Sequence, residues 1–151
     1  MRIAAGLVND IGTAEDVVQE VFLMLVQSAG SFKVKKNLKG YLTTCVVNKI
    51  RNLSRTKNSR NPVSLDDVEP AISNFKTAEQ CMICDEEFQL LYKAMAKLPY
   101  EQKEAVILHI QGKMKFKDIA TLQGAPIKTT LSRYNYGLNK LRSMLNSEIE
   151  K

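Results

Sequence analysis

Helical spacing of apolar residues in the first part of the chain constrains its fold more than any other sequence feature. Six apolar side chains recur at i, i+3, i+4, i+7, i+8 and i+11, and they are Ala14, Val17, Val18, Val21, Phe22 and Leu25. Thr13 precedes this stripe and Asp16 lies in the first turn, which predicts a helix with Thr13 as its N-cap. Sustained alternation is scarce and no Asn-Gly or Asp-Gly turn occurs. The pattern therefore favours an all-α fold.

The same period predicts further helices, separated by breaks. One runs from about residue 38 to 57, and its inward side chains are Leu38, Tyr41, Leu42, Cys45, Val46 and Leu53. Residues 58–78 are rich in Asn, Ser and Pro, which indicates a flexible linker. Beyond it we expect a helix over 79–98 with Phe88, Leu91 and Met95 on one side, then helices over 100–111, 116–123 and 127–145. The chain should therefore form two small helical domains, over 1–57 and 79–151.

The net charge of +6 is unevenly distributed along the 151 residues. Residues 1–60 hold ten basic and four acidic side chains, 61–90 hold one basic and seven acidic, and 91–151 hold 11 basic and five acidic. No acid occurs between Glu20 and Asp66. A solvated helix face normally mixes both signs, so the acid-free run predicts a surface that faces phosphates. The acidic middle segment, by contrast, should avoid DNA.

The segment Phe116–Arg142 has the pattern of a helix-turn-helix. Gly124 can adopt the positive φ that a tight turn needs, and Ala120 permits a close helix crossing. The expected inward stripe of the second helix is Ile127, Leu131, Tyr134, Leu138 and Leu141. The other side is left with Lys128, Thr129, Ser132, Arg133 and Tyr136. Such side chains at the start of a recognition helix can reach base edges and phosphates, although an ordinary helical hairpin would show the same pattern.

Two polar faces carry functional candidates in the first domain. Asp16, Gln19 and Glu20 lie opposite the apolar stripe, where they either compensate the helix dipole or dock a basic partner. Nothing in the residues alone separates these alternatives. On the next helix one exposed face would carry Asn48, Arg51, Asn52 and Arg55. Asn and Arg are the side chains that contact bases through two hydrogen bonds, which favours a DNA-binding role for this face.

Four short motifs occur in order along nearly the whole chain. They are AEDVVQEVF over 14–22, the Tyr-Leu and Asn/Arg residues over 41–55, LPYEQK over 98–103, and Asp118-Ile-Ala with Thr129, Ser132-Arg133 and Leu141-Arg142. Each motif is degenerate. Together they resemble the motifs of bacterial sigma factors of the extracytoplasmic-function (ECF) group.

The resemblance implies a transcription initiation factor that is not an enzyme and needs no cofactor. Residues 1–57 would be sigma region 2, residues 79–151 region 4, and the 58–78 linker would lie in the RNA exit path of the polymerase. Core-polymerase contacts would come from Asp16, Gln19, Glu20 and Leu23. The partners would be core RNA polymerase, promoter DNA and an anti-sigma factor. The protein would work in the bacterial cytoplasm without membrane insertion.

DNA contacts are also implied by the resemblance. The minus-ten element would be bound by Lys33, Lys35, Lys36, Tyr41, Asn48, Arg51, Asn52 and Arg55, with the 33–38 loop capturing a flipped base. The minus-thirty-five element would be bound by Lys128, Thr129, Ser132, Arg133 and Tyr136.

The sequence also departs from the family pattern. Asn52 replaces a common Asp, Lys128 a frequent Gly, Thr130 an apolar valine that packs, and Leu131 a common basic residue. The family's first helix normally begins earlier, which suggests a late start or a truncation.

The remaining signals leave alternative functions open. Cys81 and Cys84 form a CxxC motif, but only Cys45 and His109 could complete a tetrahedral site, so we expect no metal. No apolar run approaches the roughly 18 residues that span a bilayer. A stand-alone helix-turn-helix regulator would explain only the C-terminal half. A thiol oxidoreductase that uses the CxxC would need strand–helix alternation and a nucleophile–base pair, and the sequence shows neither. An adaptor of paired helical domains stays open as a third alternative.

Overall fold

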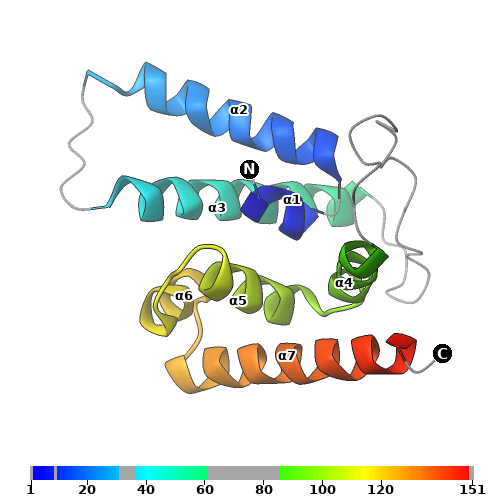
Figure 1. Ribbon diagram of the computed structural model, residues 1–151. Coiled ribbons are helices and arrows are strands. Elements are labelled where there is room, and N and C mark those ends of the chain that lie inside the picture. Colours follow the sequence, from blue (N-terminus) through cyan, green and yellow to red (C-terminus); the bar gives the residue numbers. More distant parts are fainter. Residues whose placement is uncertain (1, 9, 31–36, 61–85, 150–151) are drawn as a thin grey trace. The chain divides into compact units, whose positions relative to one another are not determined.

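The computed structural model describes residues 2–8, 10–30, 37–60 and 86–149 (Figure 1). All regular structure in these ranges is α-helical, which confirms the predicted fold class. The chain divides into two compact units, Met1–Phe75 and Lys76–Lys151, and each is described by itself. Most of the expected linker lies outside the described residues, as do Cys81 and Cys84.

Unit 1 consists of α1 (Arg2–Val8), α2 (Ile11–Gln27) and α3 (Leu38–Arg60). Helices α2 and α3 run antiparallel, and α1 packs against both (Figure 1). The core side chains are Ala4, Leu7, Ala14, Val17, Val21, Val47 and Ile50, none more than 4% exposed. Removing such apolar side chains from water is the main force that holds three short helices together.

The start of α2 differs from the prediction that Thr13 is the N-cap. The N-cap is Asp10, whose carboxylate accepts a hydrogen bond from the Thr13 backbone N–H at 3.0 Å. The Thr13 hydroxyl donates to the same carboxylate. The prediction was wrong because it began the helix at the first residue of the apolar stripe, whereas Asp10 provides the preferred capping carboxylate one turn earlier.

Helix α1 was not predicted, because seven residues give too short a window for helical periodicity. Its apolar residues do follow a helical spacing, and they are Ile3, Ala4, Leu7 and Val8. Two of them, Ala4 and Leu7, are buried against the other helices. The weak spacing signal was therefore real, although the sequence offered no cap to support it.

Three side chains expected to point inward are instead exposed in unit 1. Phe22 is 52% exposed, and Leu38 and Tyr41 are each 46% exposed. Helix α3 instead buries Val47 and Ile50. The predicted stripe counted every apolar side chain as core, but a small three-helix unit covers only one narrow side of each helix.

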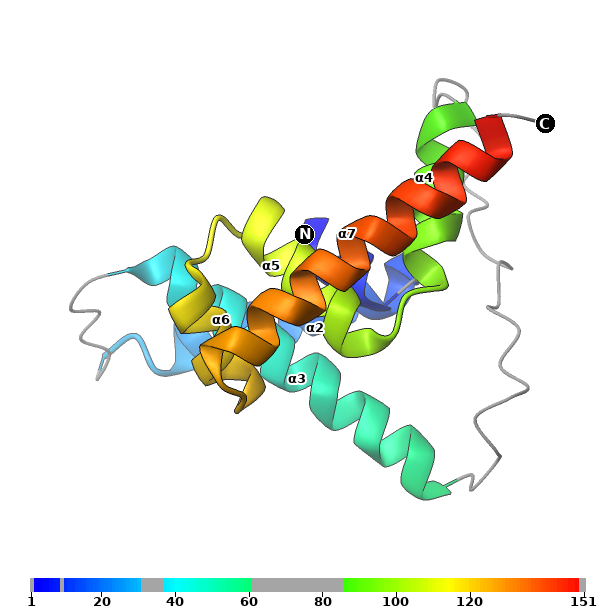
Figure 2. The same ribbon diagram turned by 90° about the horizontal axis from the view of Figure 1, so that it is seen from below.

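Unit 2 consists of α4 (Glu86–Ala96), α5 (Tyr100–Ile110), α6 (Phe116–Gln123) and α7 (Ile127–Ile149). Helix α7 packs against the other three (Figure 2). Six consecutive residues of α5, over 103–108, are buried. Another buried cluster joins Ala94, Leu98, Val106 and Leu141. The ends of α5 and α6 match the predicted ranges within one residue, whereas α3 and α7 extend to residues 60 and 149.

The turn between α6 and α7 has the geometry predicted from Gly124. This glycine has φ 62° and caps α6 in the left-handed region. Its N–H donates to the Thr121 carbonyl at 3.2 Å, and the Ala125 N–H donates to the Ala120 carbonyl at 3.0 Å. These two hydrogen bonds form a Schellman motif, which ends α6 and redirects the chain into α7. Ala120 is buried, as expected for a close crossing.

The buried side of α7 is rotated from the predicted stripe. Ile127 is 50% and Leu131 41% exposed, whereas Thr130 is fully buried. Gly137 also faces the core, since a Cβ atom there would lie 3.0 Å from Val106 Cγ2. Small and polar residues therefore form part of the contact between α5 and α7, and a count of apolar residues alone misplaces that side. In α4, Leu91 is likewise 39% exposed, although it was expected inward.

Candidate partner and nucleic-acid interfaces

The structure brings the predicted docking residues of α2 onto one exposed side. We call this surface the α2 acidic face, and it consists of Asp16, Gln19, Glu20 and Leu23. All four are exposed, and Leu23 has 60% of its surface in solvent. They lie opposite the buried Ala14, Val17 and Val21 because of the helical repeat. Two carboxylates beside an exposed leucine suit a partner that is both basic and partly apolar.

The C-terminal half of α2 exposes further apolar side chains beside Leu23, including Phe22, which was expected in the protein interior. We call Phe22, Leu23, Met24 and Val26 the α2 apolar end, and they are 52%, 60%, 59% and 70% exposed. Single exposed apolar residues are common, but a contiguous group marks an interaction site. The signal in the sequence was the continuous apolar run over 21–26, which is longer than one buried stripe requires.

Helix α3 carries the predicted amide and guanidinium groups. The α3 polar face consists of Asn48, Arg51, Asn52 and Arg55. Asn48, Asn52 and Arg55 are exposed, while Arg51 is half-buried and already takes part in interactions within the protein. Three of the four predicted side chains are therefore free to meet a ligand from solvent.

An ion pair joins α2 to α3 beside these two faces. Lys49 Nζ contacts Glu20 Oε2, and the two side chains are 34% and 51% exposed. Glu20 belongs to the α2 acidic face, and Lys49 directly follows Asn48 of the α3 polar face. The ion pair thus joins the α2 acidic face to a residue that borders the α3 polar face.

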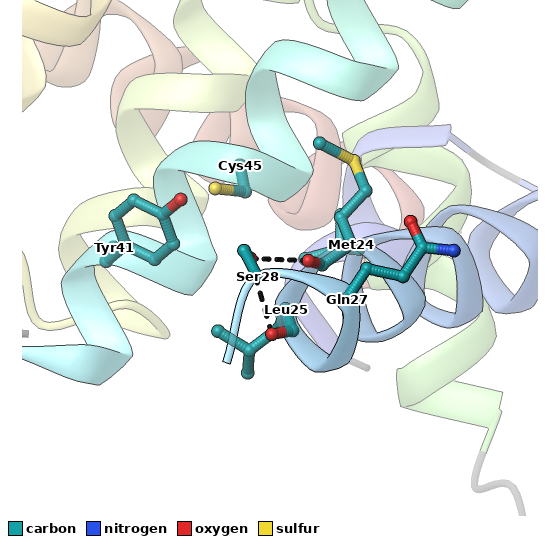
Figure 3. Close-up of a pocket in the computed structure, with 7 residues that line it drawn as sticks. Met24, Leu25, Gln27, Ser28, Tyr41 and Cys45 are labelled. Carbon is teal, nitrogen blue, oxygen red and sulfur yellow. Dashed lines mark hydrogen bonds between the residues drawn. The ribbon is translucent and has the colours of Figure 1, made fainter. Parts of the chain in front are cut away.

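A cavity of about 400 Å³ lies between the end of α2 and the start of α3 (Figure 3). Tyr41 and Cys45 of α3 face Met24 of α2 and Ser28, the C-cap residue of α2, across it. Ser28 Oγ donates to the Met24 carbonyl at 2.6 Å, so the serine stays at the end of the helix. A hydrogen bond with Cys45 raises the pKa of the Tyr41 phenol above its ordinary value.

The predicted lysines of the adjoining loop, Lys33, Lys35 and Lys36, lie outside the described residues. A second, apolar cavity of about 520 Å³ lies among the three helices of unit 1. Its lining residues include Ile3 of α1, Val18 and Phe22 of α2, and Leu42 and Val46 of α3. Phe22 therefore belongs to the α2 apolar end and also lines this second cavity.

The helix-turn-helix residues of unit 2 fall into two groups. Lys128, Thr129, Ser132 and Tyr136 are exposed on α7, and Tyr136 is 67% exposed. Arg133 is half-buried, and its Nη1 donates to Gln123 Oε1 at 3.0 Å. Four of the five predicted side chains therefore face solvent.

Gln123 links three helices of unit 2 behind that exposed surface. Its Nε2 donates to Glu104 Oε2 at 2.9 Å and to the Glu101 carbonyl at 3.0 Å. Its Oε1 accepts from Arg133, so one amide connects α5, α6 and α7. Sequence analysis missed Gln123 because its position near a helix end gives no pattern. The network fixes the angle at which α7 leaves the turn.

His109 packs in an aromatic cluster. Its ring stacks on Phe116 with a centroid distance of 4.2 Å and meets the edge of Tyr134 at 5.0 Å. His109 Nδ1 also forms a hydrogen bond with the Met114 carbonyl at 2.9 Å. The only histidine of the chain is thus a packing residue of unit 2.

Among the described residues, no three His, Cys, Asp or Glu side chains gather in a way that could hold a metal ion. No helix of the described segments has the length and apolarity to cross a membrane.

Known sigma factors are similar to this chain in sequence. Residues 1–60 match the family model "Sigma-70 region 2". The ECF RNA polymerase sigma factor EcfG of Rhodopseudomonas palustris is 28% identical over 142 residues, which cover 94% of this chain and 76% of that protein. The ECF RNA polymerase sigma-E factor of Escherichia coli K12 is 25% identical over 130 residues, covering 81% of this chain and 68% of the relative.

A solved structure is similar over most of both chains. The sigma factor RpoE of Bartonella quintana, determined in complex with the anti-sigma factor NepR, superposes with a TM-score of 0.72. The match covers 96% of this chain and 88% of that chain at 25% identity. A stand-alone helix-turn-helix regulator would leave the match over residues 1–60 unexplained. These similarities together support an RNA polymerase sigma factor of the ECF group, and residues 1–60 match its region 2.

Proposed function

We propose that this sigma factor directs promoter-specific initiation by binding core RNA polymerase and recognising the minus-ten and minus-thirty-five elements. Unit 1 would act as region 2 and unit 2 as region 4, with the acidic segment between them in the RNA exit path. The observation that carries the proposal is the exposed α2 acidic face within a segment that matches the region 2 family model.

Core polymerase would bind the α2 acidic face. The carboxylates of Asp16 and Glu20 would pair with basic side chains of the polymerase clamp, and Leu23 would be buried against it. A mixed charged and apolar surface supports this role because charges direct association whereas burial of an apolar side chain provides affinity. Val26 lies three residues after Leu23, on the same side of α2, and would extend the same contact.

Minus-ten recognition would use the α3 polar face and the cavity between α2 and α3. Asn48, Asn52 and Arg55 present groups that can bind base edges and phosphates of the duplex upstream. A base that leaves the stack must recover an unstacking cost of a few kcal/mol. The Tyr41 ring beside the 400 Å³ cavity could offset that cost by stacking, typically about 1–3 kcal/mol per base.

Minus-thirty-five recognition would use the exposed side of α7. Lys128, Thr129, Ser132 and Tyr136 are available to contact the major groove, as in other helix-turn-helix proteins. Arg133 would act chiefly by holding α7 in place through its hydrogen bond to Gln123. We therefore expect it to contribute less than the exposed side chains to direct contacts with DNA. The Gln123 network would thereby keep the recognition helix rigid.

An anti-sigma factor is a further proposed partner, as found for the similar Bartonella protein. The chain itself would catalyse no reaction, because RNA synthesis belongs to the polymerase. It would work in the bacterial cytoplasm, where polymerase and promoter DNA are found.

Core binding tests the proposal directly. The double variant Gln19→Ala/Glu20→Lys should lose binding to purified core polymerase in a pull-down while its circular dichroism spectrum stays unchanged. Glu15→Lys is a matched control, because Glu15 is an exposed acid of α2 outside the acidic face and its reversal should retain binding. Retained binding by the double variant would refute the docking assignment.

Promoter opening tests the DNA-binding half of the proposal. Arg55→Ala should reduce open-complex formation more than core affinity, since the exposed Arg55 belongs to the face of α3 that is assigned to DNA. Permanganate footprinting and competition for core polymerase measure the two effects separately. Arg2→Ala, an exposed arginine of α1, is the control. Equal loss of both properties in Arg55→Ala would count against the assignment.

A further inference from the structure

The ion pair between Lys49 and Glu20 joins two surfaces with different proposed partners, DNA for the side of Lys49 and polymerase for the side of Glu20. Glu20 is part of the surface assigned to polymerase, whereas Lys49 lies on the helix assigned to DNA. Neither side chain is buried, since they keep 34% and 51% exposure for Lys49 and Glu20. Each can therefore exchange its present partner for another without any rearrangement of the core.

Lys49 is well placed to reach DNA once it is released. It follows Asn48 directly and lies three residues before Asn52, so it borders the α3 polar face on the side of α2. It also belongs to the run of the chain that contains no acid between Glu20 and Asp66. Lys49 therefore has no acid close to it in the sequence of α3. Its acidic partner, Glu20, belongs to the neighbouring helix α2.

We propose that Lys49 is a phosphate-binding residue that Glu20 holds in the free protein and that polymerase releases. When basic groups of the polymerase neutralise Glu20, the Lys49 ammonium group loses its partner on α2 and binds a DNA phosphate instead. The inference rests on the proposed function, because it takes polymerase as the ligand of Glu20. It assigns Lys49 a role in DNA binding and makes that role depend on polymerase.

The strength of the contact suits such an exchange. Ion pairs between exposed side chains are weak and screened by salt, so a polymerase surface with several bases can displace Lys49. The same weakness limits the effect, and we expect a change in DNA affinity of about two- to fivefold. By linkage, DNA bound to Lys49 should strengthen core binding by the same factor.

The salt dependence of DNA binding measures whether Lys49 contacts a phosphate. Each phosphate contact adds about 0.9 to the slope of log K against log salt for duplex DNA. For the free full-length protein on a random-sequence duplex, Glu20→Gln should raise affinity about two- to fivefold and steepen the slope by about 0.9. Lys49→Gln should change neither the DNA affinity nor the salt slope of the free protein, because in that state Lys49 is paired with Glu20 and not with a phosphate. Glu15→Gln is the control for the loss of one negative charge and should leave the slope unchanged.

The holoenzyme should respond in the opposite way. With wild-type Glu20, Lys49→Gln should weaken promoter binding about two- to fivefold and reduce the slope by about 0.9. Lys97→Gln removes an exposed lysine of unit 2 and serves as the control. Equal slopes for wild-type and Lys49→Gln holoenzymes would overturn the inference, as would an unchanged slope for free Glu20→Gln. Suppose that either of these results is found while the wild-type protein binds core polymerase and initiates normally. The proposed function would then stand, and only this inference would fail.

Discussion

Thr130 places a hydroxyl group in the interior of unit 2. The residue is fully buried, and its Oγ1 has no hydrogen-bond partner among the described residues. An unpaired buried hydroxyl costs roughly 1–3 kcal/mol, and valine has nearly the same shape. We therefore expect Thr130→Val to raise the free energy of unfolding by about 1–2 kcal/mol, measured by urea denaturation followed by circular dichroism.

The neighbouring threonine provides the comparison for that substitution. Thr129 is exposed at the start of α7, so Thr129→Val should change stability by less than about 0.5 kcal/mol. A loss of stability in Thr130→Val would mean that the hydroxyl group has a partner in solution. The result also bears on the sequence, because the resemblance to sigma factors leads us to expect an apolar valine at position 130.

Gly124 is the position at which the backbone alone dictates the residue. Its φ of 62° is unfavourable for residues with a Cβ atom, yet no heavy atom lies within 4 Å of where that Cβ would be. The cost of Gly124→Ala is therefore conformational, and we expect about 1–2 kcal/mol of lost stability in thermal unfolding. Gly124→Asn should lose less, since Asn tolerates this region.

Gly12→Ala is the control for the loss of a glycine. Gly12 lies in α2, where the nearest heavy atom to an added Cβ is 3.8 Å away. The substitution should not destabilise the protein, because alanine favours helices over glycine. Equal destabilisation of Gly12→Ala and Gly124→Ala would contradict the role given to the left-handed cap.

At the scale of elements, α5 is the helix with the longest buried segment in unit 2, and it includes a lysine. Burial lowers the pKa of the Lys103 ammonium group below its ordinary value of 10.5. Between the lowered pKa and 10.5 the unfolded chain binds a proton that the folded chain lacks, so stability rises with pH in that window. We expect Lys103→Met to remove this part of the rise, measured by urea denaturation at a series of pH values from 7 upward.

Lys97→Met tests whether the rise of stability with pH depends on the burial of the lysine. Lys97 is exposed, so its replacement should leave the slope of stability against pH unchanged. Parallel profiles for the wild type and Lys103→Met would contradict the prediction.

Sequence patterns predicted the helices well where they are long or bounded by a strong signal. The Phe116–Gln123 helix and its glycine cap were predicted correctly, because the positive φ of a tight turn selects glycine strongly. Helix α1 was missed because it spans only seven residues. The buried sides of α3 and α7 were misplaced because Thr43, Thr130 and Gly137 take core positions that a count of apolar residues omits.

The candidate site was predictable to the extent that surfaces follow helical spacing. Asp16, Gln19 and Glu20 share a face because their spacing requires it. Contacts between helices are set by packing, so the pairing of Lys49 with Glu20 and the Gln123 network could not be derived from spacing within one helix. The partial burial of Arg51 and Arg133 also depends on packing between helices, so the sequence did not predict it.

At the scale of the whole molecule, the division into two units predicts separate folding. The buried cluster of Ala94, Leu98, Val106 and Leu141 lies entirely within Lys76–Lys151. We expect a fragment of those residues to be helical and to unfold cooperatively, with Thr130→Val stabilising it as much as it stabilises the full chain. Circular dichroism during urea denaturation tests this, and a fragment without helical structure would contradict it.

The α2 apolar end has a consequence for how much of this protein a cell can maintain. Phe22, Leu23, Met24 and Val26 remain in water whenever no partner covers them. Exposed apolar groups of this kind are what chaperones and proteases detect in incompletely folded chains. Copies made in excess of their partners should therefore be degraded faster than bound ones. The lifetime of the protein, and with it the output of its genes, would then follow the supply of partners as well as the rate of synthesis.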